Sequence, residues 1–123
     1  MTPAELEALI DAGERRACVS VLEGLPEAER AKLGTAAVTK LKAIVKGVRP
    51  AYFTSLDPND DSLVPDAPVS IDAFRDAQAA VLLTASFSQW KSVSRYGLPS
   101  DELVLRILRH RRVTWLNEMV ELI

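Results

Sequence analysis

The sequence predicts an all-α protein built from six to eight short helices in antiparallel hairpins. Apolar residues recur at helical spacing along most of the 123 residues, no stretch shows convincing strand-type alternation, and short turn signals separate the periodic segments. Hydrophobic residues make up 48% of the chain and charged residues 26%, so there is enough apolar material for one core. We therefore expect a single helical domain over residues 1–123.

The first two helices are expected from clear boundary signals. Thr2 is an N-cap candidate with Pro3 at the first helical position and Glu5 three residues later, which is the pattern of a capping box, and Gly13 is expected to end this helix. The next helix is expected to bury one apolar face, formed by Cys18, Val21, Leu22 and Leu25.

A third helical segment begins at Pro26 and runs to about Val48. Gly34 and Thr35 allow a break within it, and its predicted apolar side comprises Ala37, Leu41, Ile44, Val45 and Val48. Residues 49–70 show no periodicity and are predicted to form one long Asp/Pro-rich loop. They contain four prolines and four aspartates, namely Pro50, Pro58, Pro65, Pro68, Asp57, Asp60, Asp61 and Asp66.

Helices resume at Ser70, a second N-cap candidate. The helix over residues 70–85 is expected to form the buried centre of the fold, because residues 79–83 are apolar nearly all round. Ser86 and Gln89 form another capping-box pattern, which opens a short helix carrying Phe87, Trp90 and Val93. Ser100 is expected to cap a helix from Asp101 to about Arg111, and Thr114 is expected to begin a last helix.

Two segments of the chain resemble each other. Residues 5–25 align with residues 102–122 so that Glu5 matches Glu102 and Leu6 matches Leu103, and both segments are predicted to be helix–turn–helix pairs. This similarity points toward the stacked helix pairs of an α-solenoid. Two unrelated amphipathic hairpins also share identical residues to this extent by chance. A true internal repeat and a chance similarity therefore both stay open.

Several phrases of the sequence are typical of one group of proteins. They run from Thr2 to Gly13, from Leu25 to Arg30 and from Leu98 to Leu103, followed by Arg111-Arg112 and Trp115-Leu116. These residues resemble the N-terminal region of a family of large, uncharacterised bacterial helical-repeat proteins, over most of the chain outside residues 49–70. The resemblance implies a HEAT-like N-terminal module of a longer cytoplasmic protein, and it implies no activity.

Composition excludes several classes of protein. The net charge of −2 argues against a dedicated polyanion binder, and a single Cys with a single His excludes a disulfide framework or a Cys/His zinc site built from this chain alone. No secretory signal pattern opens the chain, and its most apolar run, around residues 79–83, is far too short to cross a membrane. We expect a cytoplasmic protein without a membrane partner.

The candidate catalytic residues lack the accompanying sequence features that catalysis would require. Ser88 and Lys91 match the Ser-x-x-Lys pattern of acyl-serine enzymes, but no other part of that active site accompanies them. His110 is expected near a helix C-terminus, where a cation complements the helix dipole, and Cys18 is expected to be a small core residue. We therefore predict no catalytic residue and no cofactor.

A calcium-loop pattern is incomplete in the same way. Asp57, Asn59 and Asp61 occupy its first, third and fifth positions, but Ser62 stands where a glycine is needed and Pro68 where a bidentate glutamate should close the site. We predict a solvated loop and no metal site.

Charge is segregated along the chain. The region from Arg30 to Leu56 holds six basic residues and no acid, whereas the region from Asp57 to Asp76 holds six acids and one base. A candidate patch for an anion or a partner comprises Lys42, Lys46, Arg49, Arg109 and Arg112. The alternatives are that the acidic loop folds over the basic helix or that both are simply solvated.

These observations favour a non-enzymatic protein-interaction or scaffold module. Its partner is expected to be another protein or the remainder of its own longer chain, because the apolar pattern continues to Ile123, and this pattern also allows a homo-oligomer through the C-terminal helix. The alternative is a weak nucleic-acid-binding module that uses the basic helix at residues 40–49, namely Lys40, Lys42, Lys46 and Arg49, with Arg109, Arg111 and Arg112.

Overall fold

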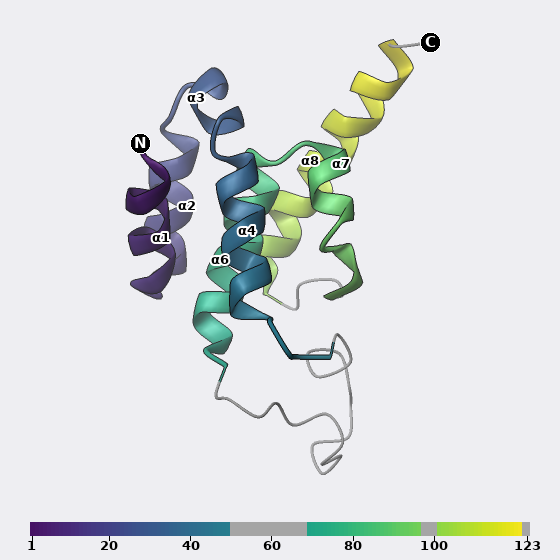
Figure 1. Cartoon of the computed structure of the whole chain (residues 1–123). Helices are drawn as coiled ribbons and strands as arrows, with labels where there is room; N and C mark the ends of the chain where they lie inside the picture. Colours follow the sequence, from purple (N-terminus) through teal and green to yellow (C-terminus); the bar gives the residue numbers. More distant parts are fainter. Residues whose placement is uncertain (50–68, 97–100, 122–123) are drawn as a thin grey trace.

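A computed structural model describes residues 1–49, 69–96 and 101–121, with side chains described up to Glu118. Within these ranges the chain forms seven α-helices and one short 3-10 helix, and no strand (Figure 1). The all-α prediction is confirmed. The predicted loop, with its calcium-like pattern and its proposed contact with the basic helix, lies almost entirely outside the described residues.

Helix α1 (Pro3–Asp11) has the predicted boundaries. The Thr2 hydroxyl accepts a hydrogen bond from the Glu5 backbone N–H at 3.2 Å and donates one to the Glu5 carboxylate. Gly13 follows the helix with a φ of +71°, a backbone conformation that glycine adopts without strain, so the chain reverses there into α2 (Arg15–Glu23).

The buried face of α2 is rotated from the predicted one. Cys18 and Leu22 are buried as expected, but Val19 is buried as well, and Val21 is 42% exposed. The inclusion of Val21 in the core was wrong, because the face against α6 is centred between Cys18, Val19 and Leu22 and leaves Val21 at its solvent edge.

The third predicted segment is divided in two, at the break that Gly34 allows. Helix α3 (Glu27–Ala31) begins after Pro26, and α4 (Gly34–Ile44) buries Ala37 and Leu41. Gly34 is required by close packing, since a Cβ there would lie 2.5 Å from Gln89 Oε1 and 3.0 Å from the Thr84 carbonyl oxygen.

Helix α6 (Ile71–Thr84) is the central helix, as predicted. Ser70 caps it by accepting a hydrogen bond from the Ala73 N–H at 3.2 Å, and all residues from Asp76 to Thr84 are buried. The next helix, α7 (Phe87–Lys91), opens with the predicted capping box of Ser86 and Gln89, and a 3-10 turn, η2 (Ser94–Tyr96), follows it.

The predicted pair of C-terminal helices is wrong, because helix α8 (Glu102–Glu121) is continuous. The chain forms one 20-residue helix instead of two helices with a break before Thr114. No glycine or proline interrupts this stretch, and the Thr114 hydroxyl donates to the His110 carbonyl oxygen within the helix instead of capping a new one. Residues 102–121 therefore do not match α1 and α2 as a helix–turn–helix pair.

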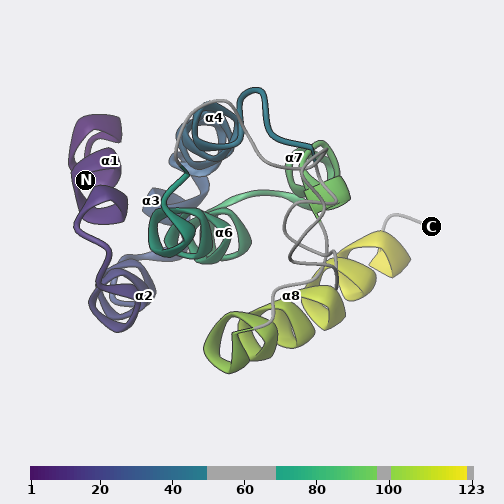
Figure 2. The same cartoon turned by 90° about the horizontal axis from the view of Figure 1, so that it is seen from below.

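The helices lie in two rows. In Figure 2, α1, α4 and α7 form one row and α2, α6 and α8 form the other, with α6 in contact with α1, α2, α3, α4 and α8. Small residues on α6, including Ala77, Ala79 and Ala80, allow its neighbours to approach closely. The C-terminal half of α8 extends beyond the other helices (Figures 1 and 2).

Candidate functional site

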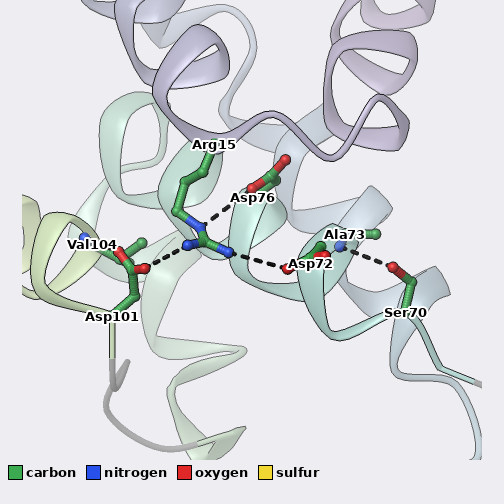
Figure 3. Close-up of polar contacts among 7 residues, drawn as sticks. All are labelled: Arg15, Ser70, Asp72, Ala73, Asp76, Asp101 and Val104. Atoms are coloured by element: carbon green, nitrogen blue, oxygen red, sulfur yellow. Dashed lines mark hydrogen bonds and ion pairs between the residues drawn. The ribbon is translucent and has the colours of Figure 1, made fainter.

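One arginine joins three helices through three aspartates (Figure 3). Arg15 is the first residue of α2, Asp72 and Asp76 lie one turn apart on α6, and Asp101 directly precedes α8. Arg15 Nη2 lies 3.6 Å from Asp72 Oδ1, Arg15 Nε lies 3.3 Å from Asp76 Oδ1, and Arg15 Nη1 donates to Asp101 Oδ2.

The two inner carboxylates differ in their electrostatics. Asp76 is fully buried, and burial raises its pKa to about 6, with Arg15 opposing this rise and Asp72 and Asp101 adding to it. For Asp101, burial also acts to raise the pKa, but the Val104 N–H and Arg15 outweigh it and the pKa is lowered. Asp101 therefore stays ionised at neutral pH and caps α8, which begins at Glu102. The sequence predicted this capping role for the preceding residue, Ser100, which lies outside the described residues.

This cluster is structural. The neighbouring Cys18 is buried, and burial, followed by the charge of Asp76, raises the pKa of its thiol to about 11, so the thiol is protonated at neutral pH. The assignment of Cys18 to the core is confirmed. The cluster of Arg15 and the three aspartates fixes the start of α8 against α2 and α6.

An open groove of about 580 Å³ lies beside this cluster, between α2 and α8. Val19 and Leu103 provide apolar surface, and the exposed arginines Arg16, Arg106 and Arg109 provide positive charge. Ser20, Glu23 and Glu102 complete the lining. The groove thus offers apolar contact, three guanidinium groups and two carboxylates.

One face of α8 extends from this groove to the projecting half of the helix. It comprises Glu102, Arg106, Arg109, Val113 and Leu116, which recur at alternating spacings of four and three residues, as positions on one helix face do. Val113 and Leu116 are each 59% exposed. We call this set of five residues the α8 face.

The predicted basic patch is not assembled as one surface. Arg109 belongs to the groove and Arg112 is exposed on α8, whereas Lys42, Lys46 and Arg49 are exposed on or after α4, in the opposite row of helices (Figure 2). Lys40 is engaged instead in an ion pair with Asp11 of α1, with Nζ and Oδ1 2.9 Å apart.

Within the described residues, the fold forms no catalytic or metal-binding arrangement around the other candidate residues. Ser88 and Lys91 are both exposed on α7. His110 lies in the middle of α8, so its predicted place at a helix C-terminus was wrong. In the described part of the chain, no group of three His, Cys, Asp or Glu side chains could hold a metal ion.

Sequence reasoning missed Arg15, Arg16 and Arg106. A signal for Arg15 was present, because Asp76 belongs to the helix predicted to form the buried centre of the fold, and a buried carboxylate requires a cationic partner. No such signal exists for Arg16 and Arg106, since exposed arginines are typical of any helix surface.

Among the helices described, none is long and apolar enough to cross a membrane. No protein-family model matches the chain, and no significant match was found among curated proteins or solved structures. The resemblance to bacterial helical-repeat proteins stays a prediction.

Proposed function

We propose that the chain is a non-enzymatic protein-interaction module that binds an acidic amphipathic helix of a protein partner along α8. The observation that carries this proposal is the α8 face, which begins in the groove with α2 and continues onto the projecting half of α8 with two exposed apolar side chains. A helix of this length with an uncovered apolar strip is typical of an element that packs against another helix.

The chemistry of the α8 face supports a partner of this kind. Its spacing of four and three residues fits the knobs-into-holes packing of two helices, which requires apolar partner residues opposite Val113 and Leu116. Arg106 and Arg109, with Arg16 across the groove, favour glutamates or aspartates on the partner at the other end of the contact. The two glutamates of the groove disfavour a uniformly charged polyanion such as nucleic acid.

The arrangement of the helices supports a solenoid-like, HEAT-like stack as part of the same proposal. Helix α1 contacts α2, α4 contacts α6, and α6 contacts both α2 and α8. Helices α7 and α8 meet through the rings of Phe87 and Trp90 against that of Trp115. In such stacks each pair buries a face on the next one. The outer surface of the last pair, which carries the α8 face, is then the place where a further helix docks.

A labelled synthetic peptide tests the proposal. It is about 20 residues long, with leucines at heptad positions and glutamates beside them, and its binding is followed by fluorescence anisotropy. We expect the chain to bind it, and expect Leu116→Asp, or Arg106→Glu with Arg109→Glu, to weaken binding by at least about tenfold. Lys42→Glu with Lys46→Glu changes the net charge equally on the opposite row and should leave binding unchanged.

Three outcomes would overturn the proposal. The first is equal weakening by the Lys42 and Lys46 changes, which would indicate non-specific attraction. The second is competition by a single-stranded oligonucleotide that is lost with Arg106→Glu and Arg109→Glu, which would favour nucleic acid. The third is a dimer in light scattering that Leu116→Asp converts to a monomer, since a second copy would then occupy the α8 face.

A further inference from the structure

The two walls of the groove are joined at one end by an ion pair. Arg15 begins α2, and Asp101 directly precedes α8. In the described part of the chain, no other hydrogen bond or ion pair joins α2 to Asp101 or α8. The residues next to this pair line the groove, namely Arg16 on α2 with Glu102 and Leu103 on α8. A change in the Arg15–Asp101 ion pair therefore acts on the position of both walls.

Arg15 is shared with a buried carboxylate, that of Asp76. Asp76 has no exposed surface, and neither of its carboxylate oxygens accepts a hydrogen bond from the described residues. Its ion-pair partner is Arg15 Nε, 3.3 Å from Oδ1, and the same guanidinium also faces Asp72 and Asp101 (Figure 3). Burial without hydrogen-bond donors favours the protonated form of a carboxyl group. The geometry thus makes Asp76 the member of the cluster that takes up a proton most readily.

The charges that act on Asp76 come from the cluster itself. Burial raises the pKa of Asp76 to about 6, Arg15 opposes this rise, and Asp72 and Asp101 add to it. Asp101 is ionised at this pH because its pKa is lowered, so an ionised Asp76 repels it. Cys18 contributes no charge, since burial raises the pKa of its thiol to about 11.

The other elements that contact α6 direct their charged groups elsewhere. Asp11 of α1 pairs with Lys40 of α4, and the charged residues of α3 lie at the pocket beside Thr84, the last residue of α6. The first charged residues of α8 are exposed, namely Glu102, Arg106, Arg109 and His110. Histidine side chains titrate in the same pH range as Asp76, so His110 requires a control variant.

We propose that a proton on Asp76 strengthens the Arg15–Asp101 ion pair and thereby favours binding of the partner helix in the groove between α2 and α8, a control that rests on the proposed function. With Asp76 ionised, the guanidinium is divided among three carboxylates, and Asp76 repels Asp101. With Asp76 protonated, this repulsion is gone and Arg15 is left to Asp72 and Asp101. The start of α8 is then held more tightly to α2.

The direction of the pH effect follows from linkage. The partner contacts both walls of the groove, so its binding favours the state in which the walls are joined, and that state favours the proton on Asp76. The complex therefore takes up a proton, and binding is tighter below the pKa of Asp76 than above it. We expect a change in affinity of at least about threefold between pH 7.5 and pH 5.5.

Nuclear magnetic resonance of the free chain tests the ion pair without a partner. The Arg15 Nε–Hε signal reports on one end of it, and the backbone N–H of Val104, which donates to Asp101 Oδ1 at 3.1 Å, reports on the other. We expect both signals to move with one midpoint near pH 6 in the wild-type chain and neither to move in that range in Asp76→Asn.

Two control variants identify the titrating group. Asp72→Asn should keep the transition and move it to lower pH, because Asp72 raises the pKa of Asp76, and His110→Gln should leave it unchanged. Movement of the Arg15 signal without movement of the Val104 signal would show that the proton does not act on α8, and this result would overturn the proposal. A transition that persists in Asp76→Asn would overturn it as well.

Binding of the labelled amphipathic peptide at pH 5.5 and pH 7.5 tests the consequence. The glutamates of the peptide stay mostly ionised at both values. The wild-type chain should bind at least about threefold more tightly at pH 5.5, whereas Asp76→Asn should bind equally at both. Equal wild-type affinity at the two values would overturn the control by Asp76 and leave the helix-binding function standing. No binding at either value would overturn both.

Discussion

At the scale of single residues, the fold depends on Arg15. Its guanidinium compensates the fully buried Asp76 and also contacts Asp72 and Asp101, so one side chain joins α2, α6 and the start of α8. A buried carboxylate without a partner is costly, whereas an exposed charge is worth little. The stability of the chain should therefore depend on Arg15 far more than on its neighbour Arg16.

Arg15→Gln should lower the free energy of unfolding by about 3 kcal/mol or more, because it leaves Asp76 buried without a cation. The matched change Arg16→Gln, at an exposed position one residue along the same helix, should lower it by less than about 0.5 kcal/mol. Urea unfolding followed by circular dichroism measures both values. Equal effects of the two changes would contradict the structural role of the cluster.

Asp76 should make the chain more stable at mildly acidic pH. Its pKa is about 6 in the folded state against 3.8 for an ordinary aspartate, so the folded state binds the proton first and stability falls as pH rises from about 4 to about 6. The two pKa values correspond to at most about 3 kcal/mol. Asp101, whose pKa is lowered, acts in the opposite direction and only at more acidic pH.

Thermal unfolding at pH 5 and pH 7 measures this effect. We expect a higher midpoint at pH 5 for the wild-type chain, and a much smaller difference for Asp76→Asn, which cannot ionise at that position. A wild-type midpoint that is lower at pH 5, or an unchanged difference in Asp76→Asn, would show that Asp76 is not the titrating group.

At the scale of helices, how closely two helices can approach each other matters for stability as much as helix propensity does. Gly34 begins α4 where α6 and α7 meet, and an added Cβ would lie 3.0 Å from the Thr84 carbonyl oxygen and 3.1 Å from the Ala85 Cα. The Gln89 side chain at 2.5 Å cannot move away freely, since its Oε1 accepts the Ser86 N–H of the capping box. The backbone of α6 must shift to make room.

Gly34→Ala should lower the free energy of unfolding by about 1–2 kcal/mol, since overpacking outweighs the gain that alanine gives in a helix. Gly24→Ala is the control: its added Cβ would lie 3.4 Å from the Ser20 carbonyl oxygen, an ordinary contact, and its effect should be near zero or stabilising. Chemical denaturation of both variants measures these changes in the free energy of unfolding. A Gly34→Ala variant that is more stable than the wild type would contradict the packing of α4 on α6.

The sequence predicted helices best where local signals decide them. Thr2, Gly13, Ser70 and the capping box at Ser86 are boundary signals that act within one turn, and all four were confirmed. The sequence did not predict the continuity of α8, because a threonine hydroxyl such as that of Thr114 can either cap a new helix or bond back within one. The tertiary contacts of Arg111 and Trp115 favour the continuous helix. Long-range contacts such as Arg15 with Asp101 leave no local pattern.

At the scale of the whole molecule, two rows of helices leave one helix partly uncovered. The core surrounds α6, whereas α8 is packed through Val104, Ile107, Leu108 and Trp115 and then extends beyond its neighbours (Figure 1). Helical backbone without tertiary packing is marginally stable in water. The projecting end of α8 is therefore expected to open readily in the isolated chain and to be stabilised by a partner helix.

Amide hydrogen exchange of α8, with and without the acidic amphipathic peptide, tests the proposed function most directly. We expect rapid exchange of residues 116–121 in the free chain and slowed exchange of residues 106–121 when the peptide is bound, with α1 and α4 unchanged. Slow exchange of residues 116–121 in the free chain, or protection by the peptide at α4 instead of α8, would contradict it.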